Sequence, residues 1–424
     1  MNYQDVIPNL SPVWTHYTPI IASKGAGSYI YDQDGTPYLD FSCGIGVTNT
    51  GHCHPKVVAA VRDQAENLLH GQVNIVLHEP LLKLIRELKT IVPPEIDAFF
   101  FSNSGAEAVE GAMKLARQTT GRPNIIVFQG SFHGRTIGTM SLTMSKTVYR
   151  VGYQPLMPGV IVAPYPYAYR YGWEAEKTSE WCLEELELLF LTQTTPQETA
   201  AILVETVLGE GGYVPPPASF LKGLRKICDR HGIMLILDEI QCGFGRTGKW
   251  FAFEHYNIIP DIMTVAKGLA SGLPISGVFS RMDIMKKWVP GSHGGTYGGN
   301  AVAAAAGVAT IQAMREDNML ENAINRGQEM VVGLRKLQED YPVIGDVRGL
   351  GLMIASEFTD PKTGKADKST AKNVVHACFD RKLILLTCGP WDNTIRWIPP
   401  LNVSQSQIQT ALSILSESLK EVCN

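Results

Sequence analysis

The feature of this chain that most constrains its fold is a regular alternation of short apolar segments with longer segments of helical periodicity. Between about residues 55 and 290, apolar runs such as 200–205 and 233–238 alternate with stretches such as 106–120, where small and apolar residues recur every three or four positions. This pattern is typical of a parallel sheet covered by helices, because the chain must cross back over the sheet between parallel strands. The expected strands are 97–101, 124–128, 159–163, 200–205, 233–238, 262–266 and 275–280.

The two ends of the chain have a different pattern. Segments 28–31 and 37–40 flank Asp34-Gly35, a dipeptide that favours a hairpin turn. The elements expected after residue 315 are helices at 319–338, 369–381 and 404–422 and β-segments at 346–358, 383–387 and 394–398. We therefore expect an α/β fold in which a large domain with a mainly parallel sheet carries a smaller α+β domain built from both chain ends. The expected division is 1–50, 51–315 and 316–424.

Composition narrows the class of protein. The chain has 424 residues, of which 45% are hydrophobic, and a formal net charge of −4. A large core is therefore expected, whereas nucleic acid and membrane surfaces are poor candidates as partners because no basic excess is present. The N-terminus has no signal-peptide pattern and the apolar run 301–309 is too short to span a bilayer, so we expect a cytoplasmic protein. The eight cysteines form no CxxC pair, and His52-Cys53-His54 is interpreted as a turn, so no metal site is expected.

A glycine pattern after one strand resembles a dinucleotide-binding motif. Gly243, Gly245 and Gly248 have the GxGxxG spacing. That motif needs a carboxylate that ends the next strand and holds a ribose, and positions 262–266 contain none. We interpret the glycines as a tightly packed turn.

A stronger chemical signal is the pair formed by Asp238 and Lys267, which follow two successive expected strands. Because side chains alternate along a strand, Asp238 and Ile240 should face one side while Glu239 points away. A buried carboxylate beside an aliphatic side chain suits a flat aromatic cation, and a lysine amine can form a Schiff base with a carbonyl cofactor. Pyridoxal phosphate matches both requirements, because its protonated ring nitrogen makes it an electron sink.

An anion site is expected between strand 97–101 and helix 106–120. Small residues at 102–108 precede the helix, and backbone N–H groups at a helix N-terminus bind phosphate well. Simple N-capping by Ser104 is the alternative reading. Phe132 and His133 follow the next expected strand and supply an aromatic face for a cofactor ring.

These residues lie in motifs that resemble the class III, fold type I aminotransferases, most closely the 4-aminobutyrate branch. The likeness covers nearly the whole chain, and the DExQ…K combination is its most specific part. The matching motifs are YLDF at 38–41, SNSGAEA at 102–108, SFHGRT at 131–136, GEGG at 209–212, DEIQCGFGRTG at 238–248, AKG at 266–268, GGTYGGN at 294–300 and GDVRGLG at 345–351.

The resemblance implies a role for each matching residue around pyridoxal phosphate. Lys267 and Asp238 would be catalytic, with Lys267 forming the Schiff base and Asp238 binding the ring nitrogen. It also implies a homodimer in which each partner contributes to the other's site. The remaining implied cofactor-binding residues are Ser104, Gly105 and Ala106 for the phosphate, Phe132, His133 and Ile240 around the ring, Gln241 near the phenolic oxygen, and Thr296 from the partner subunit.

The resemblance also implies how carboxylate substrates would bind. Arg135 would hold the carboxylate of an ω-amino acid, while Glu210 would pair with Arg396 until an α-carboxylate arrives and takes Arg396. The expected substrate-binding residues are Ile45, Arg135, Glu205, Glu210 and Arg396. Thr206, Leu208 and Phe132 depart from the 4-aminobutyrate pattern, which leaves the preferred amine donor open.

The expected activity is transfer of an amino group from 4-aminobutyrate or a similar ω-amino acid to 2-oxoglutarate by a ping-pong mechanism. Acetylornithine or ornithine aminotransferase is an alternative within the same chemistry. A pyridoxal-phosphate-dependent racemase, epimerase or aminomutase is an alternative of another class, and it would need no keto acid. A protein that kept the fold and lost the cofactor is the third alternative.

Overall fold

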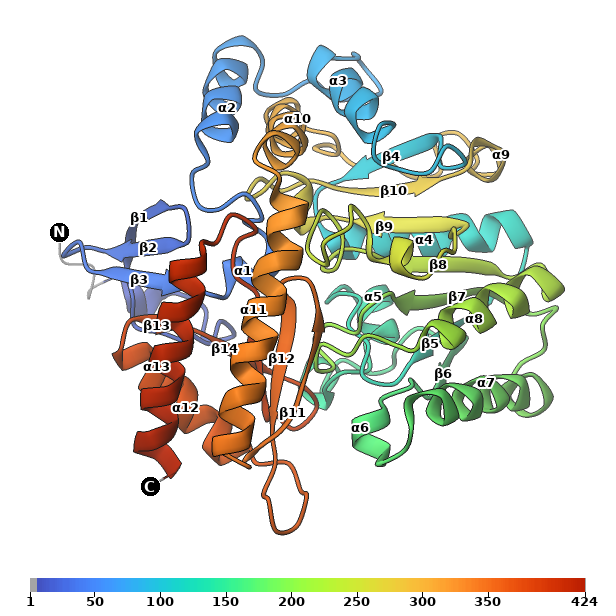
Figure 1. Ribbon diagram of the computed structural model, residues 1–424. Coiled ribbons are helices and arrows are strands. Elements are labelled where there is room, and N and C mark those ends of the chain that lie inside the picture. Colours follow the sequence, from blue (N-terminus) through green and yellow to red (C-terminus); the bar gives the residue numbers. More distant parts are fainter. Residues whose placement is uncertain (1–5, 424) are drawn as a thin grey trace.

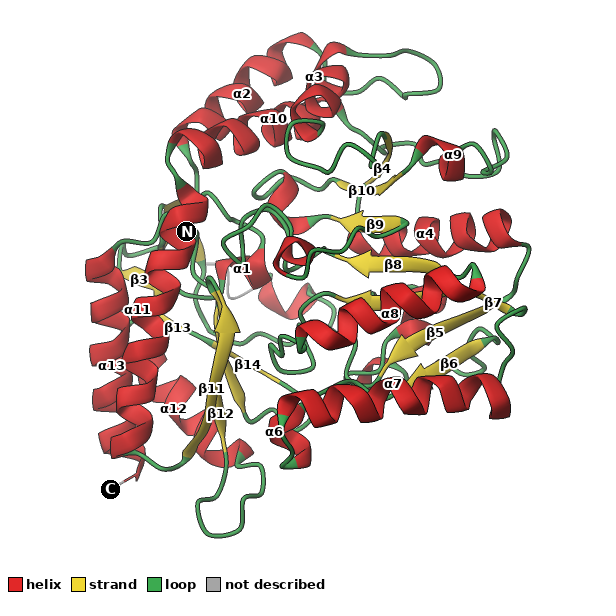
Figure 2. Ribbon diagram, turned by 45° about the vertical axis from the view of Figure 1, so that its right-hand side comes forward, coloured by secondary structure: helices red, strands yellow, loops and turns green. Residues whose placement is uncertain are grey.

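A seven-stranded sheet in the order β4-β10-β9-β8-β7-β5-β6 forms the centre of the molecule. The computed structural model describes residues 6–423, so residues 1–5 of the first expected domain segment lie outside the described part. Figures 1 and 2 show the sheet between layers of helices. The strands match the apolar runs identified in the sequence: β4 (Ala98–Ser102), β5 (Asn124–Phe128), β6 (Val160–Ala163), β7 (Thr199–Glu205), β8 (Met234–Asp238), β9 (Ile262–Val265) and β10 (Ser276–Ser280).

The sheet is mainly parallel, as expected, but one strand runs the other way. The pairs β8–β9, β7–β8, β5–β7 and β5–β6 are parallel, whereas β10 is antiparallel to both β9 and β4. The expectation of parallel pairing is therefore wrong at β10. The connection 266–275 is shorter than the dozen or more residues that a parallel crossover needs, so the chain returns in the opposite direction.

Alternating side chains give the central strands two apolar faces, and a different set of helices packs on each. In β7, Ile202 belongs to a buried cluster with side chains of α7 (Ala175–Thr192) and α8 (Ala218–His231). Leu203, the next residue, belongs to a second cluster formed largely by α4 (Gly105–Thr120). Burial on both faces explains why these strands are continuous apolar runs rather than alternating ones.

The C-terminal part of the chain forms an antiparallel sheet in the order β11-β12-β15-β14. Three helices pack beside it, coloured orange to red in Figure 1. The strands are β11 (Ile344–Leu350), β12 (Met353–Phe358), β14 (Leu386–Cys388) and β15 (Thr394–Trp397), and the helices are α11 (Met319–Asp340), α12 (Lys368–Asp380) and α13 (Gln405–Cys423).

A third sheet joins the two ends of the chain. Its strands are β1 (Ala22–Ala26), β2 (Tyr29–Asp32), β3 (Pro37–Asp40) and β13 (Leu383–Ile384). The expected hairpin is confirmed by the antiparallel β2–β3 pair. The single strand expected at 383–387 is wrong, because β13 pairs with β3 while β14 belongs to the C-terminal sheet, so the segment divides between two sheets. The division at residues 50 and 315 stays a prediction.

The glycines that resemble a dinucleotide-binding motif form a tight turn. Gly245 and Gly248 have φ of 82° and 87°, and a Cβ at Gly245 would lie 2.5 Å from the Met314 side chain. Among residues 6–423, the remaining helices are α1 (Cys43–Gly46), α2 (Pro55–Asn67), α3 (Glu79–Leu88), α5 (Ile137–Leu142), α6 (Ala168–Tyr171), α9 (Met282–Met285) and α10 (Ala301–Glu316), with 3-10 turns at Ile7–Asn9, Thr147–Tyr149, Ala252–His255 and Lys267–Leu269.

No helix in the described part of the chain is both long enough and apolar enough to cross a membrane.

Candidate active site

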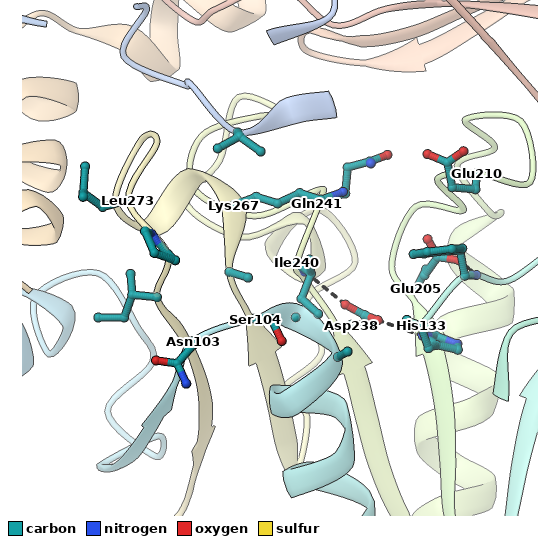
Figure 3. Close-up of a pocket in the computed structure, with 18 of the residues that line it drawn as sticks. Asn103, Ser104, His133, Glu205, Glu210, Asp238, Ile240, Gln241, Lys267 and Leu273 are labelled. Carbon is teal, nitrogen blue, oxygen red and sulfur yellow. Dashed lines mark hydrogen bonds and ion pairs between the residues drawn. The ribbon is translucent and has the colours of Figure 1, made fainter. Parts of the chain in front are cut away.

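Most of the residues singled out in the sequence meet in one cavity of about 340 Å³ beyond the carboxyl ends of the central strands (Figure 3). Open α/β sheets bind ligands at this edge, where loops and helix N-termini converge. The expected site residues that line the cavity are Ser104, Gly105, Ala106, Phe132, His133, Glu205, Glu210, Asp238, Ile240, Gln241 and Lys267.

Asp238 is held in place at the end of β8 by hydrogen bonds to both of its carboxylate oxygens. His133 Nδ1 lies 2.7 Å from one oxygen, and the amide of Ile240 donates to the other at 3.1 Å. Both side chains are buried, and His133 Nε2 has no hydrogen-bond partner. Glu239 points away from the cavity, as expected, and accepts hydrogen bonds from Thr206 and backbone amides. The geometry offers a fixed, desolvated carboxylate to a cationic ring.

Lys267 follows β9 and enters the same cavity with an unusual backbone. Its φ of 42° lies in the left-handed region, which is strained for a side chain other than glycine and is common at functional sites. Burial lowers the pKa of Lys267, although the negative charge of Glu210 opposes the shift. Because only the neutral amine is nucleophilic, a lowered pKa makes this lysine more reactive toward a carbonyl group.

The expected anion site lies at the N-terminus of α4. Ser104 forms a capping box with Glu107, which accepts from the Ser104 amide at 2.9 Å. Ser104 therefore caps the helix, and it also lines the cavity, so its expected contact with a phosphate stays a prediction. Gly105 and Ala106 line the cavity, and the first amides of a helix have no intrahelical acceptor. The two amides and the helix dipole together can bind an anion.

Replacing Gly105 by alanine is expected to weaken cofactor binding by about tenfold. A Cβ at this position would come within 3.0 Å of Ile240 Cδ1 and 3.3 Å of its Cγ2, so Ile240 would have to move within the cavity that it lines. The measurement is the dissociation constant of pyridoxal phosphate for the two proteins. Unfolding of the cofactor-free proteins is the control, and an equal loss of stability there would show a folding defect instead.

Glu205 lies beside Asp238, because the two residues are opposite each other in the parallel register of β7 and β8. Burial raises the pKa of Glu205 to about 8, and the nearby Asp238 charge adds to the shift. Amides of Phe132 and Gly209 donate to its oxygens at 2.9 and 3.0 Å. The raised pKa reduces the negative charge at this end of the cavity and leaves Asp238 as the main anion.

Glu210 and Arg396 form an ion pair at the rim of the cavity. Arg396 comes from β15, is almost fully buried and also donates to the Thr387 carbonyl at 3.2 Å. Burial raises the pKa of Glu210, but the charges of Arg396, Lys267 and Lys146 oppose it and the net shift is downward. The pair that the sequence resemblance implies is therefore present in the folded chain.

The positions that depart from the 4-aminobutyrate pattern lie away from the Glu210 carboxylate. Thr206 donates to Glu239 at 2.7 Å, and Leu208 is buried near Gly130. Phe132 makes an edge contact with Tyr149, with 5.4 Å between ring centroids. These departures therefore do not disrupt the Glu210–Arg396 pair.

Four expected site residues do not line the main cavity of this chain, and one of them is Arg396, which reaches its rim through the ion pair with Glu210. Arg135 lies over the Tyr149 ring at 4.7 Å and lines a neighbouring cavity of about 630 Å³. Ile45 lies in α1 with φ of 67° and is 37% exposed, and Thr296 is exposed in the loop before α10. Arg135 and Phe132, which lines the main cavity, both contact the Tyr149 ring. Ile45 and Thr296 do not line the cavity of their own chain.

Sequence reasoning missed several residues that complete the cavity. Val47 and the loop 272–275 line it, and the loop belongs to the connection from β9 to the antiparallel β10. Gly272 has φ of 132°, so the glycine was a usable signal of an irregular turn. The cavity wall formed by this loop depends on the direction of β10, which apolar periodicity does not encode.

Comparison with known proteins gives matches along nearly the whole chain. The family described as aminotransferase class-III matches residues 10–419. The 5-aminovalerate aminotransferase DavT of Pseudomonas aeruginosa is 40% identical and the alignment covers 95% of this chain and 94% of DavT. The 4-aminobutyrate aminotransferase GabT of Escherichia coli is also 40% identical with the same coverage. A PLP-bound amine transaminase from an uncultivated Pseudomonas species superposes with a TM-score of 0.91 at 28% identity, covering 97% of this chain and 98% of its own.

Proposed function

The chain belongs to the class III aminotransferases and is a pyridoxal-phosphate-dependent transaminase; from this premise we propose that it moves an amino group from 4-aminobutyrate or a similar ω-amino acid to 2-oxoglutarate. The relatives at 40% identity carry the names 5-aminovalerate and 4-aminobutyrate aminotransferase, which supports a donor whose amine is remote from its carboxylate. A ping-pong sequence is proposed because one cavity serves both the donor and the acceptor.

The residues of the cavity fit pyridoxal phosphate. The buried His133 Nε2 and Gln241 Oε1 atoms lack partners, and Gly105 and Ala106 line the cavity at the start of α4. When bound, the cofactor supplies a carbonyl that condenses with amines and a ring that accepts electrons. Gly105 and Ala106 are proposed to bind its phosphate, with Ser104 and its capping box fixing the helix start.

The chain's own groups are proposed to divide the proton chemistry. Asp238 would hold a proton on the ring nitrogen of the cofactor, because its carboxylate is fixed by His133 and shielded from water. Lys267 would hold the cofactor through its amine and would serve as a general base, a role that its lowered pKa favours. Phe132 and Ile240 would hold the ring of the cofactor, and Gln241 would bind its phenolic oxygen, since all three side chains line the cavity.

The observation that carries the choice of substrate is the Glu210–Arg396 ion pair near Lys267, with Arg135 in the adjoining cavity. While the pair is closed, Arg396 is neutralised and a donor without an α-carboxylate can occupy the site, with its distal carboxylate on Arg135. When the pair opens, Arg396 can bind an α-carboxylate in a bidentate manner. A dicarboxylate such as 2-oxoglutarate then uses both arginines. Glu205 lines the same cavity as Glu210, and its raised pKa reduces the negative charge there.

A homodimer is proposed because large apolar side chains are exposed near Thr296, where Asn300 contacts Leu69 and Tyr297 contacts His70. Leu69, Ile75, Leu77 and Tyr297 are 63%, 80%, 70% and 62% exposed. Exposed apolar side chains gathered in this way usually mark an interface. In such a dimer Thr296 would reach the cofactor phosphate of the partner subunit.

We expect a donor panel to show rapid conversion of 2-oxoglutarate to glutamate with 4-aminobutyrate or 5-aminovalerate. Conversion with acetylornithine or ornithine should be at least about tenfold slower, because the acetamido or amino group beside their carboxylate must fit where 4-aminobutyrate and 5-aminovalerate carry only hydrogen. The measurement is glutamate formation, with the cofactor absorbance recorded in parallel. Preference for acetylornithine would contradict the proposal, as would loss of chirality in a single amino acid without any keto acid.

A further inference from the structure

Opening the Glu210–Arg396 pair would leave the Glu210 carboxylate without a cationic partner. Its side chain is only 13% exposed, and a buried carboxylate that loses its partner is strongly destabilised. Arg396 keeps its hydrogen bond to the Thr387 carbonyl and would gain a substrate carboxylate, so its buried charge would stay paired. A second cation near Glu210 would remove the penalty and make the exchange of partners easier.

The segment 387–392 brings such a cation close to the pair. Thr387 accepts a hydrogen bond from Arg396, and the Gly389 amide donates to the Glu210 carbonyl at 2.9 Å. The turn then continues to Asp392, whose amide donates to the Gly389 carbonyl at 3.1 Å. One short segment, from β14 to the turn before β15, therefore contacts both members of the ion pair and ends at a half-buried acid.

Asp392 has two lysine partners. Lys146 pairs with one carboxylate oxygen, and Lys368 donates to the other at 2.8 Å. Lys146 is only 17% exposed and lines the neighbouring cavity of about 630 Å³ together with Arg135 and Asp392. Because Lys368 can hold Asp392 alone, Lys146 can leave without creating an unpaired carboxylate.

Other groups near Glu210 are less suitable. Lys267 is close, but the proposed function commits it to the cofactor. The Tyr213 hydroxyl is buried and has no hydrogen-bond partner, yet it is neutral and can offer Glu210 only one hydrogen bond. Lys146 combines a positive charge, partial burial and a partner that it can share.

We propose that Lys146 is a positioning residue that takes over the Glu210 carboxylate when Arg396 binds a substrate α-carboxylate, while Lys368 keeps Asp392 paired. This inference rests on the proposed exchange of partners at Arg396. It makes Lys146 part of the selection between substrates with and without an α-carboxylate. We call this exchange a relay: Arg396 leaves Glu210 for the substrate carboxylate, and Lys146 leaves Asp392 for Glu210.

The test compares glutamate with 4-aminobutyrate as donors to the same cofactor form of the holoenzyme. In single turnovers followed by cofactor absorbance, Lys146→Met should lower the apparent second-order rate constant for glutamate by at least about tenfold and that for 4-aminobutyrate by less than about twofold. Lys146→Arg keeps the charge and should restore the rate with glutamate. The matched control is Lys372→Met, which removes an exposed lysine of the same cavity that belongs to neither ion pair and should leave the ratio of the two rate constants unchanged. Lys368→Met should itself slow glutamate selectively, because Lys146 could then leave Asp392 only by leaving it unpaired.

A binding experiment gives a second readout that does not depend on turnover. Glutarate carries both carboxylates and butyrate carries one, and neither can react. Calorimetry on the holoenzyme should show glutarate binding at least about tenfold more weakly to Lys146→Met than to wild type, with butyrate binding within about twofold. An equal loss for both ligands, or no loss for either, would overturn the proposal.

Two further results separate the possible failures. If Tyr213→Phe selectively slows glutamate and Lys146→Met does not, the tyrosine is the partner of the released Glu210 and the proposal is wrong. If wild type does not use 4-aminobutyrate, the proposed function fails, yet glutarate against butyrate still decides the role of Lys146. Selective weakening of glutarate in Lys146→Met would support the relay in that case too.

Discussion

Replacing Lys267 by alanine should lower transamination by about 10⁴-fold or more, since the change removes both the covalent anchor of the cofactor and the general base. Lys267 enters the cavity from the strained turn after β9, where burial lowers its pKa and favours the reactive neutral amine. The same protein should no longer carry the cofactor on the peptide that contains residue 267 after borohydride treatment. Glutamate formation and peptide mass analysis measure the two effects.

A matched control for this change is Lys249→Ala. Lys249 is an exposed lysine that does not line the cavity, so its loss should leave both readouts at the wild-type level. Thermal unfolding of the cofactor-free Lys267→Ala protein should show that the fold is intact. Transamination by Lys267→Ala at the wild-type rate would contradict the assignment of this lysine.

The strands of the central sheet could be predicted because burial on both faces leaves a clear apolar pattern. Runs such as 200–205 and 233–238 coincide with β7 and β8. Strand direction left no such trace: the apolar run at 275–280 is equally compatible with a parallel or an antiparallel strand, and only the length of the preceding connection decides between them. The pairing of β13 with β3 was likewise hidden, because two residues carry no periodicity.

The centre of the site could be predicted because parallel strands deliver their carboxyl ends to one edge of a sheet. Asp238, Lys267 and the start of α4 follow such strands, so their positions in sequence were enough to bring them together. Residues on irregular segments were not accessible in this way. Lys146 and Asp392 are 246 positions apart and meet only because the fold brings the loop after α5 against the turn before β15.

Residues expected to act across a subunit boundary form a separate class. Thr296 and Ile45 are accessible on the single chain, and no contact within residues 6–423 places them against the cavity. Their roles follow from resemblance, and a single chain cannot supply the contact that would test them. The buried pair of Glu210 with Arg396 differs, because its two members lie in one chain and the folded structure contains their contact.

The second large effect is expected from Asp238→Asn, which should lower transamination by about 10³-fold while the protein still binds the cofactor. Asparagine keeps the shape of the side chain but cannot hold a proton on a ring nitrogen, so the electron sink would be lost. Removing the Asp238 charge should also lower the pKa of Glu205, which burial and that charge together raise to about 8. Glu205 should therefore ionise at lower pH in the variant than in wild type.

Asp238→Asn can be distinguished from a general loss of buried charge by Asp261→Asn. Asp261 is a buried acid that precedes β9, at the end of the sheet away from the cavity, and it accepts from Arg225, Arg281 and the Leu235 amide. Its replacement should lower the free energy of unfolding but leave the rate per folded molecule near wild type, because none of its partners lines the cavity. Asp238→Asn should lower the rate per folded molecule and leave the free energy of unfolding near wild type. If both variants lost activity only in proportion to folded protein, Asp238 would be a structural acid, and the proton on the cofactor ring would have to be held by another group.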